Sequence, residues 1–281
     1  MRPRLLTEPA PEYGRPIAVA PGLQRIVARN PSSYTYHGTN TWLVGHDELA
    51  VIDPGPDDAE HHAAILAAVA GARVTHVLVT HHHRDHAPGA PRLASTLGAP
   101  VAAWGGARPA TGTAQLPAPD IPLAEGDAIE GKGWRLVAIH TPGHASDHLC
   151  FALEGQGILF SGDHVMGWST SVVIPPDGDM AHYMANLRRL LVRDDTLYLC
   201  GHGPPVPEPQ VLVRALLAHR EAREGQILTA VAAGAKTLQG LLARLYPGLD
   251  ESLAWAARRT LAAHLDKLEA EGRLGPGTVV R

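Results

Sequence analysis

Histidine is unusually frequent in this chain, and its densest cluster has the spacing of a metal-binding motif. The 281 residues include 17 histidines but only two phenylalanines. The heptapeptide at 80–86, Thr-His-His-His-Arg-Asp-His, directly follows an apolar run. Where a strand ends and the chain turns, His81 and His83 can point to one side while Asp85 and His86 reach a neighbouring position. We therefore expect two adjacent metal pockets at this strand end.

Three further candidate ligands follow predicted strands, each beside a glycine: His144, Asp163 and His202. Glycine lets the backbone approach a site closely and adopt conformations closed to other residues, so ligands from separate strands can converge. Imidazole nitrogens and carboxylate oxygens suit zinc, and without clustered cysteines an open catalytic site is favoured over a closed structural one. Cys200, two residues before His202, is expected to be a small buried hydrophobic residue at a strand end.

Composition and charge restrict the partners of the protein. The chain is 45% hydrophobic and 19% charged with a formal net charge of -4, which gives no general attraction to nucleic acid or anionic membranes. Two cysteines imply no disulfide framework and favour a reducing cytoplasm. Residues 1–20 are interrupted by four prolines and do not resemble a secretory signal, and no apolar segment is long enough to span a membrane. We therefore expect a cytoplasmic protein without a membrane partner.

Strands and helices alternate through the first two thirds of the chain, which is typical of an α/β layered domain. A hairpin is expected at 41–52, followed by a helix at 59–69 and a buried strand at 75–80. Further strands are expected at 100–103, 136–140, 149–153, 158–161 and 196–199, and further helices at 91–96 and 180–191. The candidate ligands follow the strands of this pattern, so the sheets must position them.

The last quarter of the chain is predicted to be helical and to form a small second domain. Four prolines stand between residues 204 and 209, so we place the domain boundary near residue 207, between a catalytic domain (1–206) and a C-terminal domain (207–281). The helices expected there, before a short hairpin that begins at 272–275, are 210–233, 238–246 and 251–271. Because basic and acidic side chains alternate in this region, a packing or dimerisation role is favoured, while nucleic-acid binding stays open.

The motif at 81–86, together with the three later ligands, resembles the metallo-β-lactamase superfamily over about residues 20–206. The resemblance implies an αββα sandwich. It also implies that a first zinc is held by His81, His83 and His144, that a second is held by Asp85, His86 and His202, and that Asp163 bridges the two zinc ions. Asp53, in Val-Ile-Asp-Pro-Gly at 51–55, matches a family aspartate that orients the ligand loop.

Segments at 38–41 and 146–148, and the tail sequences that begin at His219 and His264, resemble the β-lactamase-like protein 2 branch of this family. That branch implies a winged-helix tail and a metal-dependent endoribonuclease that prefers single-stranded RNA. His148 is predicted to support the ligands from outside. The predicted walls of the substrate pocket include three side chains, namely Asn40, Trp168 and Tyr183.

Two zinc ions about 3.5 to 4 Å apart can share a hydroxide that acts as the nucleophile. Asp85 is expected to orient this nucleophile or to shuttle its proton. The same chemistry suits phosphodiester hydrolysis of single-stranded RNA and hydrolysis of a small carbonyl substrate such as a glutathione thioester, a lactone or a β-lactam. A non-enzymatic nucleic-acid-binding regulator is a third hypothesis. A homodimer is a further expectation, drawn from relatives.

Overall fold

The first sheet runs from the N-terminus to the middle of the chain. The computed structural model describes residues 3–106 and 117–280, and in this part the first sheet has seven strands in sequential order. The strands are β1 (Ile17–Ala20), β2 (Leu23–Val27), β3 (Asn40–Gly45), β4 (Glu48–Ile52), β5 (Arg73–Leu78), β6 (Val101–Trp104) and β7 (Ile121–Leu123). From β4 to β7 neighbouring strands are parallel, and helices α1 (Ala59–Ala68) and α2 (Gly89–Leu97) connect β4 to β5 and β5 to β6.

The second sheet pairs six strands of the described chain in the order β13-β12-β11-β10-β9-β8. They are β8 (Ala128–Gly131), β9 (Trp134–His140), β10 (Leu149–Leu153), β11 (Ile158–Gly162), β12 (Leu197–Cys200) and β13 (Val206–Pro207). Helix α3 (Met180–Leu191) connects the parallel strands β11 and β12. It starts as predicted because the Asp179 carboxylate accepts a hydrogen bond from the His182 amide and so caps the helix.

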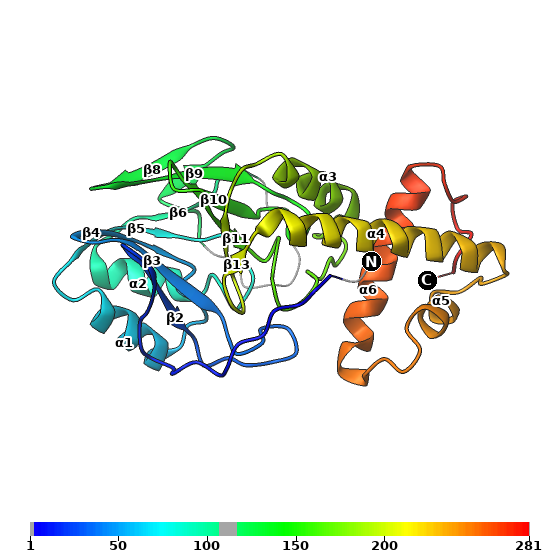
Figure 1. The fold of residues 1–281 in the computed structure, drawn as a ribbon, viewed down its shortest axis with the longest axis horizontal. Coiled ribbons are helices and arrows are strands. Elements are labelled where there is room, and N and C mark those ends of the chain that lie inside the picture. The colour runs from blue at the N-terminus through cyan, green and yellow to red at the C-terminus, as the bar shows by residue number, and fades with distance from the viewer. Residues whose placement is uncertain (1–2, 107–116, 281) are drawn as a thin grey trace.

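Apolar side chains fill three spaces between four layers. Trp42, Phe151 and Phe160 pack between the two sheets, where their burial excludes water from the centre of the sandwich. A second cluster fills the space between the first sheet and helices α1 and α2, and a third lies between the second sheet and α3. The layers are therefore helix, sheet, sheet and helix, which confirms the αββα prediction (Figure 1).

A helical tail follows the sandwich, formed by α4 (Pro209–Ala232), α5 (Leu238–Leu245) and α6 (Glu251–Ala270). Figure 1 shows α4 as one long helix that runs from the sandwich into the tail. Its first half buries Leu212 and Leu216 in the cluster with α3, whereas Ile227 near its end belongs to a separate tail cluster. The composition change near residue 207 thus lies just before α4, which packs both against the sandwich and in the tail.

The predicted terminal hairpin is not what the described residues form. The only pairing of this segment there is one parallel bridge between Val280 and Thr237, just before α5. Pro276 lacks the amide hydrogen that a ladder needs, so the chain after α6 turns back to the start of α5 instead of pairing with itself. In residues 3–106 and 117–280, no helix is both long and apolar enough to cross a bilayer.

Candidate metal centre

Four loops meet at one edge of the sandwich, and each follows a strand. The motif at 81–86 follows β5, His144 follows β9, Asp163 follows β11 and His202 follows β12. Two glycines allow this convergence: a Cβ at Gly201 would clash with Asp163, and one at Gly162 would come within 2.5 Å of His148 Nε2. The expected role of glycine beside the ligands is therefore visible in the packing.

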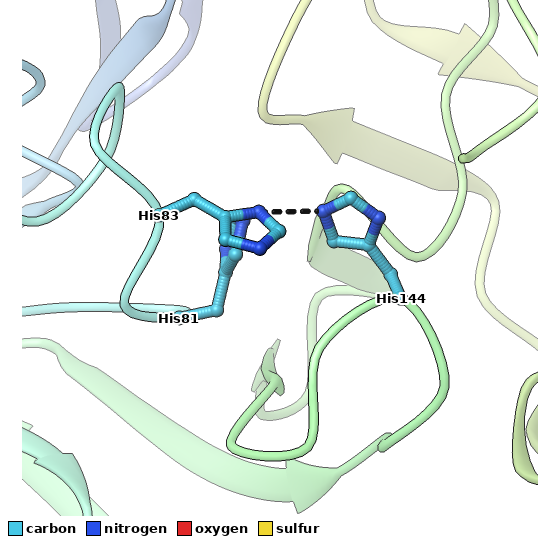
Figure 2. A group of neighbouring side chains, drawn as sticks. All are labelled: His81, His83 and His144. Carbon is cyan, nitrogen blue, oxygen red and sulfur yellow. Dashed lines mark hydrogen bonds between the residues drawn. The ribbon is translucent and has the colours of Figure 1, made fainter. Parts of the chain in front are cut away.

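The first group of predicted ligands consists of His81, His83 and His144. Their ligand atoms all lie within 4.8 Å of one another. Figure 2 shows the three rings turned toward a common point, with His83 Nδ1 and His144 Nε2 3.0 Å apart. One group of three imidazoles can therefore bind one cation.

The second group consists of Asp85, His86, Asp163 and His202, again with ligand atoms within 4.8 Å of one another. Asp163 lies between the two groups, because its Oδ2 is 3.4 Å from His202 Nε2 and 3.6 Å from His144 Nε2. The structure thus brings all seven predicted ligands to one place, with Asp163 where a bridging ligand would lie.

Hydrogen bonds on the outer side of the rings determine which nitrogens face the centre. The Nδ1 atoms of His86, His144 and His202 lie 2.8 Å from Asp53 Oδ2, 2.6 Å from the Val172 carbonyl and 3.1 Å from the Gly38 carbonyl, respectively. None of these oxygens carries a hydrogen, so each Nδ1 must donate. The Nε2 lone pairs of the three rings therefore point inward.

His81 is oriented in the same way, but its Nδ1 reaches Asp53 through the Thr80 hydroxyl. The Thr80 hydroxyl donates to Asp53 Oδ2 at 2.7 Å, so it accepts a hydrogen bond from His81 Nδ1 at 2.9 Å. His81 Nε2 is then an inward lone pair, and it is buried without a partner. Asp53 also accepts from the Thr80 amide, which holds the start of the motif loop. Asp53 is thus placed where the resemblance expects an orienting aspartate.

This arrangement fits bound cations and leaves polar atoms unpaired without them. The Nε2 lone pairs of His86 and His202 face each other at 3.2 Å, and Asp163 Oδ1 is buried with no partner. An unsatisfied buried polar atom costs about 1–3 kcal/mol. The ion pairs described for the three carboxylates of Asp53, Asp85 and Asp163 are all with histidines, so no Lys or Arg neutralises them there. The site is a metal site by its donor set and by its charge.

The electrostatics of the second group agree with a cation site. Burial alone would lower the pKa of His202, but the Asp163 and Asp85 carboxylates raise it to about 9. Burial would raise the pKa of Asp163, but His202 and His86 lower it well below its ordinary value. By contrast, burial and the neighbouring imidazoles lower the pKa of His81. The carboxylates of the second group thus favour positive charge beside them, which a bound metal ion would supply.

His148 contacts the ligand set indirectly. Its Nε2 accepts a hydrogen bond from the Asp163 amide at 3.1 Å, and its Nδ1 is 2.8 Å from the Thr141 hydroxyl. The ring is fully buried. It therefore holds the backbone of the bridging position, the kind of supporting role that the sequence suggested.

Two of the three residues predicted to line the substrate pocket are buried instead. The Asn40 amide donates to the Cys200 and Gly203 carbonyls, so it holds the His202 loop. Tyr183, on the inner face of α3, is 0% exposed and packs in the core beside His164. Both expectations are corrected, because the faces of β3 and α3 that carry these residues point into the protein.

Trp168 does lie at a hollow of the surface. Its ring stacks on Tyr36 at 5.1 Å and would clash with a Cβ at Gly203, so it covers the His202 loop. It lines a groove described below. Among the pocket candidates it is the one in a position to touch a ligand.

The sequence analysis missed two carboxylates around His82. His82 Nδ1 is 2.8 Å from Asp147 Oδ1, and His82 Nε2 is 3.6 Å from Asp177 Oδ2. Together they hold the motif loop between the loops after β9 and before α3. The Ser-Asp-His segment at 146–148 was a signal for Asp147, while nothing local indicated that Asp177 would lie there.

Comparison with known proteins agrees with this site. The family model "Metallo-beta-lactamase superfamily" matches residues 34–202. The chain belongs to the metallo-β-lactamase superfamily. A second model, "Beta-lactamase associated winged helix domain", matches residues 237–274 in the tail. The chain is thus a superfamily hydrolase with a metal-binding cluster and a winged-helix tail, as the motifs predicted.

Individual members of the superfamily resemble the chain over nearly its whole length. A Beta-lactamase-like protein 2 homolog of Drosophila melanogaster is 33% identical, over 89% of this chain and 88% of its own. An atrochrysone carboxyl ACP thioesterase of Claviceps purpurea is 29% identical, over 91% and 81%. The crystal structure of a Beta-lactamase domain protein from Burkholderia ambifaria matches with a TM-score of 0.80 at 25% identity, over 96% and 93%.

Proposed function

We propose that this protein is a binuclear zinc hydrolase that cleaves an acyl thioester, one of the small carbonyl substrates considered above. The observation that carries the proposal is the convergence of seven nitrogen and oxygen ligands in two neighbouring groups, with Asp163 between them. When bound there, two zinc ions would activate water and polarise the scissile carbonyl group.

Asp85 is the carboxylate best placed to handle protons. Its side chain is 28% exposed, against 8% for Asp163, so it meets water that enters from solvent. Its Oδ2 is 3.1 Å from His202 Nε2, which keeps it ionised at the edge of the site. During hydrolysis the water oxygen bonds to the acyl carbon and the carbon–sulfur bond breaks. Asp85 accepts the proton of the water, and the thiolate that leaves takes a proton in turn.

A thioester is supported over RNA by the charge and the surroundings of the site. The net charge of -4 opposes non-specific attraction to a polyanion. In the tail, Lys267 and Arg273 are paired with Glu224, so they are not free for phosphates. The Claviceps relative is named as a thioesterase of acyl carrier protein substrates.

Hydrolysis of single-stranded RNA is the second candidate, which the branch resemblance implies. The match of the tail to a winged-helix family is the feature that favours it, because helices of such a domain can contact a phosphate backbone. Metal-replete protein should be assayed against a thioester panel and labelled single-stranded RNA. We expect thioester turnover that a chelator abolishes. Rapid RNA cleavage without thioester turnover would replace the first proposal by the second.

Zinc content is tested separately from activity. We expect two zinc ions per folded chain by elemental analysis, and loss of one from Asp163→Ala, because this carboxylate belongs to the second group while the three imidazoles of the first group remain. Retention of both zinc ions in that variant would contradict a ligand role for Asp163. A homodimer and a cytoplasmic location stay predictions. Both cysteines are free and buried, and burial raises the pKa of Cys200 to about 11, which suits an unreactive thiol in a reducing compartment.

A further inference from the structure

A groove lies between the sandwich and the tail, beside the metal centre. It has a volume of about 350 Å³. One wall is the loop at 168–172, whose Val172 carbonyl accepts the hydrogen bond from His144. Tyr34, in the loop whose Gly38 carbonyl accepts from His202, lies on another side. The groove therefore adjoins the two loops whose carbonyl groups accept hydrogen bonds from His144 and His202.

The far wall comes from α4, the turn after α5, and α6, the helices that Figure 1 shows at the junction of sandwich and tail. Its side chains are largely apolar, including Tyr246, Leu249 and Leu253. On the sandwich side Trp168 and Met166 continue this apolar lining. A volume of this size suits one narrow ligand chain, since small-molecule sites span roughly 300–1,000 Å³.

Two guanidinium groups in the groove have no acidic partner among the described residues. Arg220, on α4, is 3% exposed; it donates to the Ser171 carbonyl, and its Nε is buried without a partner. Arg223, one turn further, donates to the Leu245 carbonyl and lies 4.1 Å over the Tyr246 ring, and its Nε is likewise unpartnered. A buried charge is costly unless it is paired. This part of the groove therefore suits an anionic group.

We infer that the groove binds the arm of the substrate beyond the scissile bond, an elongated uncharged chain that ends in a phosphate held by Arg220 and Arg223. The phosphorylated pantetheine arm of coenzyme A and of acyl carrier proteins has this chemistry. The inference rests on the proposed thioester hydrolysis and identifies its substrate class. The guanidinium pair would bind the phosphate and the apolar walls the chain, and the acyl group would extend past the loop at 168–172 toward the metal centre.

A matched pair of substrates tests the inference, because the acyl thioesters of pantetheine and of 4′-phosphopantetheine differ only by the phosphate. We expect the phosphorylated substrate to have a kcat/KM about tenfold higher. Arg223→Ala should abolish this preference, and Arg223→Gln, which retains a side-chain amide, should do the same. Arg214→Ala, an exposed change on the same helix, should keep it. A preference that survives both Arg223 variants would overturn the inference.

The source of the arm is resolved by giving the same acyl group on coenzyme A and on a carrier protein. An Arg223-dependent preference for either thioester supports binding in the groove and identifies which molecule carries the arm. A preference for the glutathione thioester over both would contradict it. Arg223-dependent binding of a single-stranded oligoribonucleotide, without any for the arm, would assign the groove to RNA and overturn it as well.

A binding measurement separates this inference from the proposed function. A thioether analogue of acyl phosphopantetheine cannot be hydrolysed, and we expect its Kd, by calorimetry on zinc-loaded protein, to rise about tenfold in Arg223→Ala. If that shift occurs but no thioester is cleaved, the groove stands and the proposed activity is wrong. If thioesters are cleaved without any effect of the phosphate, the activity stands and the groove inference is wrong.

Discussion

The metal centre and the Glu224 cluster of the tail both bury charged side chains, but only one of them balances its charges. In the tail, Glu224 is 2% exposed and pairs with Lys267 at 2.8 Å and with Arg273 at 2.6 Å. Glu271 contacts the same two cations, so two carboxylates meet two positive groups. The metal centre instead gathers three carboxylates whose described ion pairs are all with histidines.

The difference separates structural from functional burial of charge. The tail cluster balances its charges without a ligand and joins α4 to α6, so its contribution is to stability. The metal centre has inward lone pairs and unpartnered atoms, so it is complete only with cations. The following predictions test this contrast, from the largest expected effect to the smallest.

Replacing Asp85 should abolish catalysis while leaving the fold intact. We expect Asp85→Ala to lower kcat/KM about 1,000-fold, or about 4 kcal/mol, because it removes a ligand and the proposed proton acceptor. The melting temperature should not fall, since the change removes charge from a crowded acidic site. Asp57→Ala, in an exposed pair with Arg92, is the matched control. Retained turnover with intact metal content would refute the role of Asp85.

Replacing Glu224 should destabilise the fold without a direct effect on catalysis. Glu224→Gln removes the buried carboxylate from Lys267 and Arg273 and leaves Lys267 with only the more exposed Glu271, so we expect a loss of about 3 kcal/mol in the free energy of unfolding. The control is Glu221→Gln, which breaks an exposed pair with Arg188 and should cost no more than about 0.5 kcal/mol. Urea denaturation measures both. Equal losses in the two variants would mean that the buried cluster contributes no more than a surface pair.

Asp53 is a buried carboxylate outside the two ligand groups, and its hydrogen bond orients His86. We expect Asp53→Asn to weaken metal affinity by about 10- to 100-fold, since it weakens the bond that directs Nε2 inward. Competition with a fluorescent zinc chelator gives the affinity. Asp47→Asn, which breaks an exposed pair with Lys132, should leave it unchanged. Unaltered zinc affinity in Asp53→Asn would show that the outer hydrogen bond is dispensable.

The tail cluster should also give a modest acid-sensitive step in stability. Burial opposes ionisation of Glu224, but His264, Lys267 and Arg273 lower its pKa to about 2. A carboxyl with a depressed folded pKa stabilises above its unfolded value of 4.5, and this contribution disappears as pH falls from 4.5 toward 2. Urea unfolding at several pH values should show the step in the wild type. The same slope in Glu224→Gln would assign it to other groups.

Local patterns predicted the elements that carry a clear signal. Helix α3 was expected at its observed bounds from the helical pattern of its residues, and in the structure Asp179 caps it. Strands β1 and β2 were not predicted, although Pro21-Gly22 between two short apolar runs is a turn signal. Strand β13 has two residues, too few for any pattern.

The sequence by itself determined which residues are the candidate metal ligands, because their residue types, their spacing and the glycines beside them are local properties of the chain. Only the tertiary structure decided what surrounds them. Asn40 and Tyr183 point inward because of how the layers stack, and Arg220 reaches Ser171 across 49 positions of sequence. Such contacts depend on the docking of whole helices and sheets, which no short stretch of residues specifies.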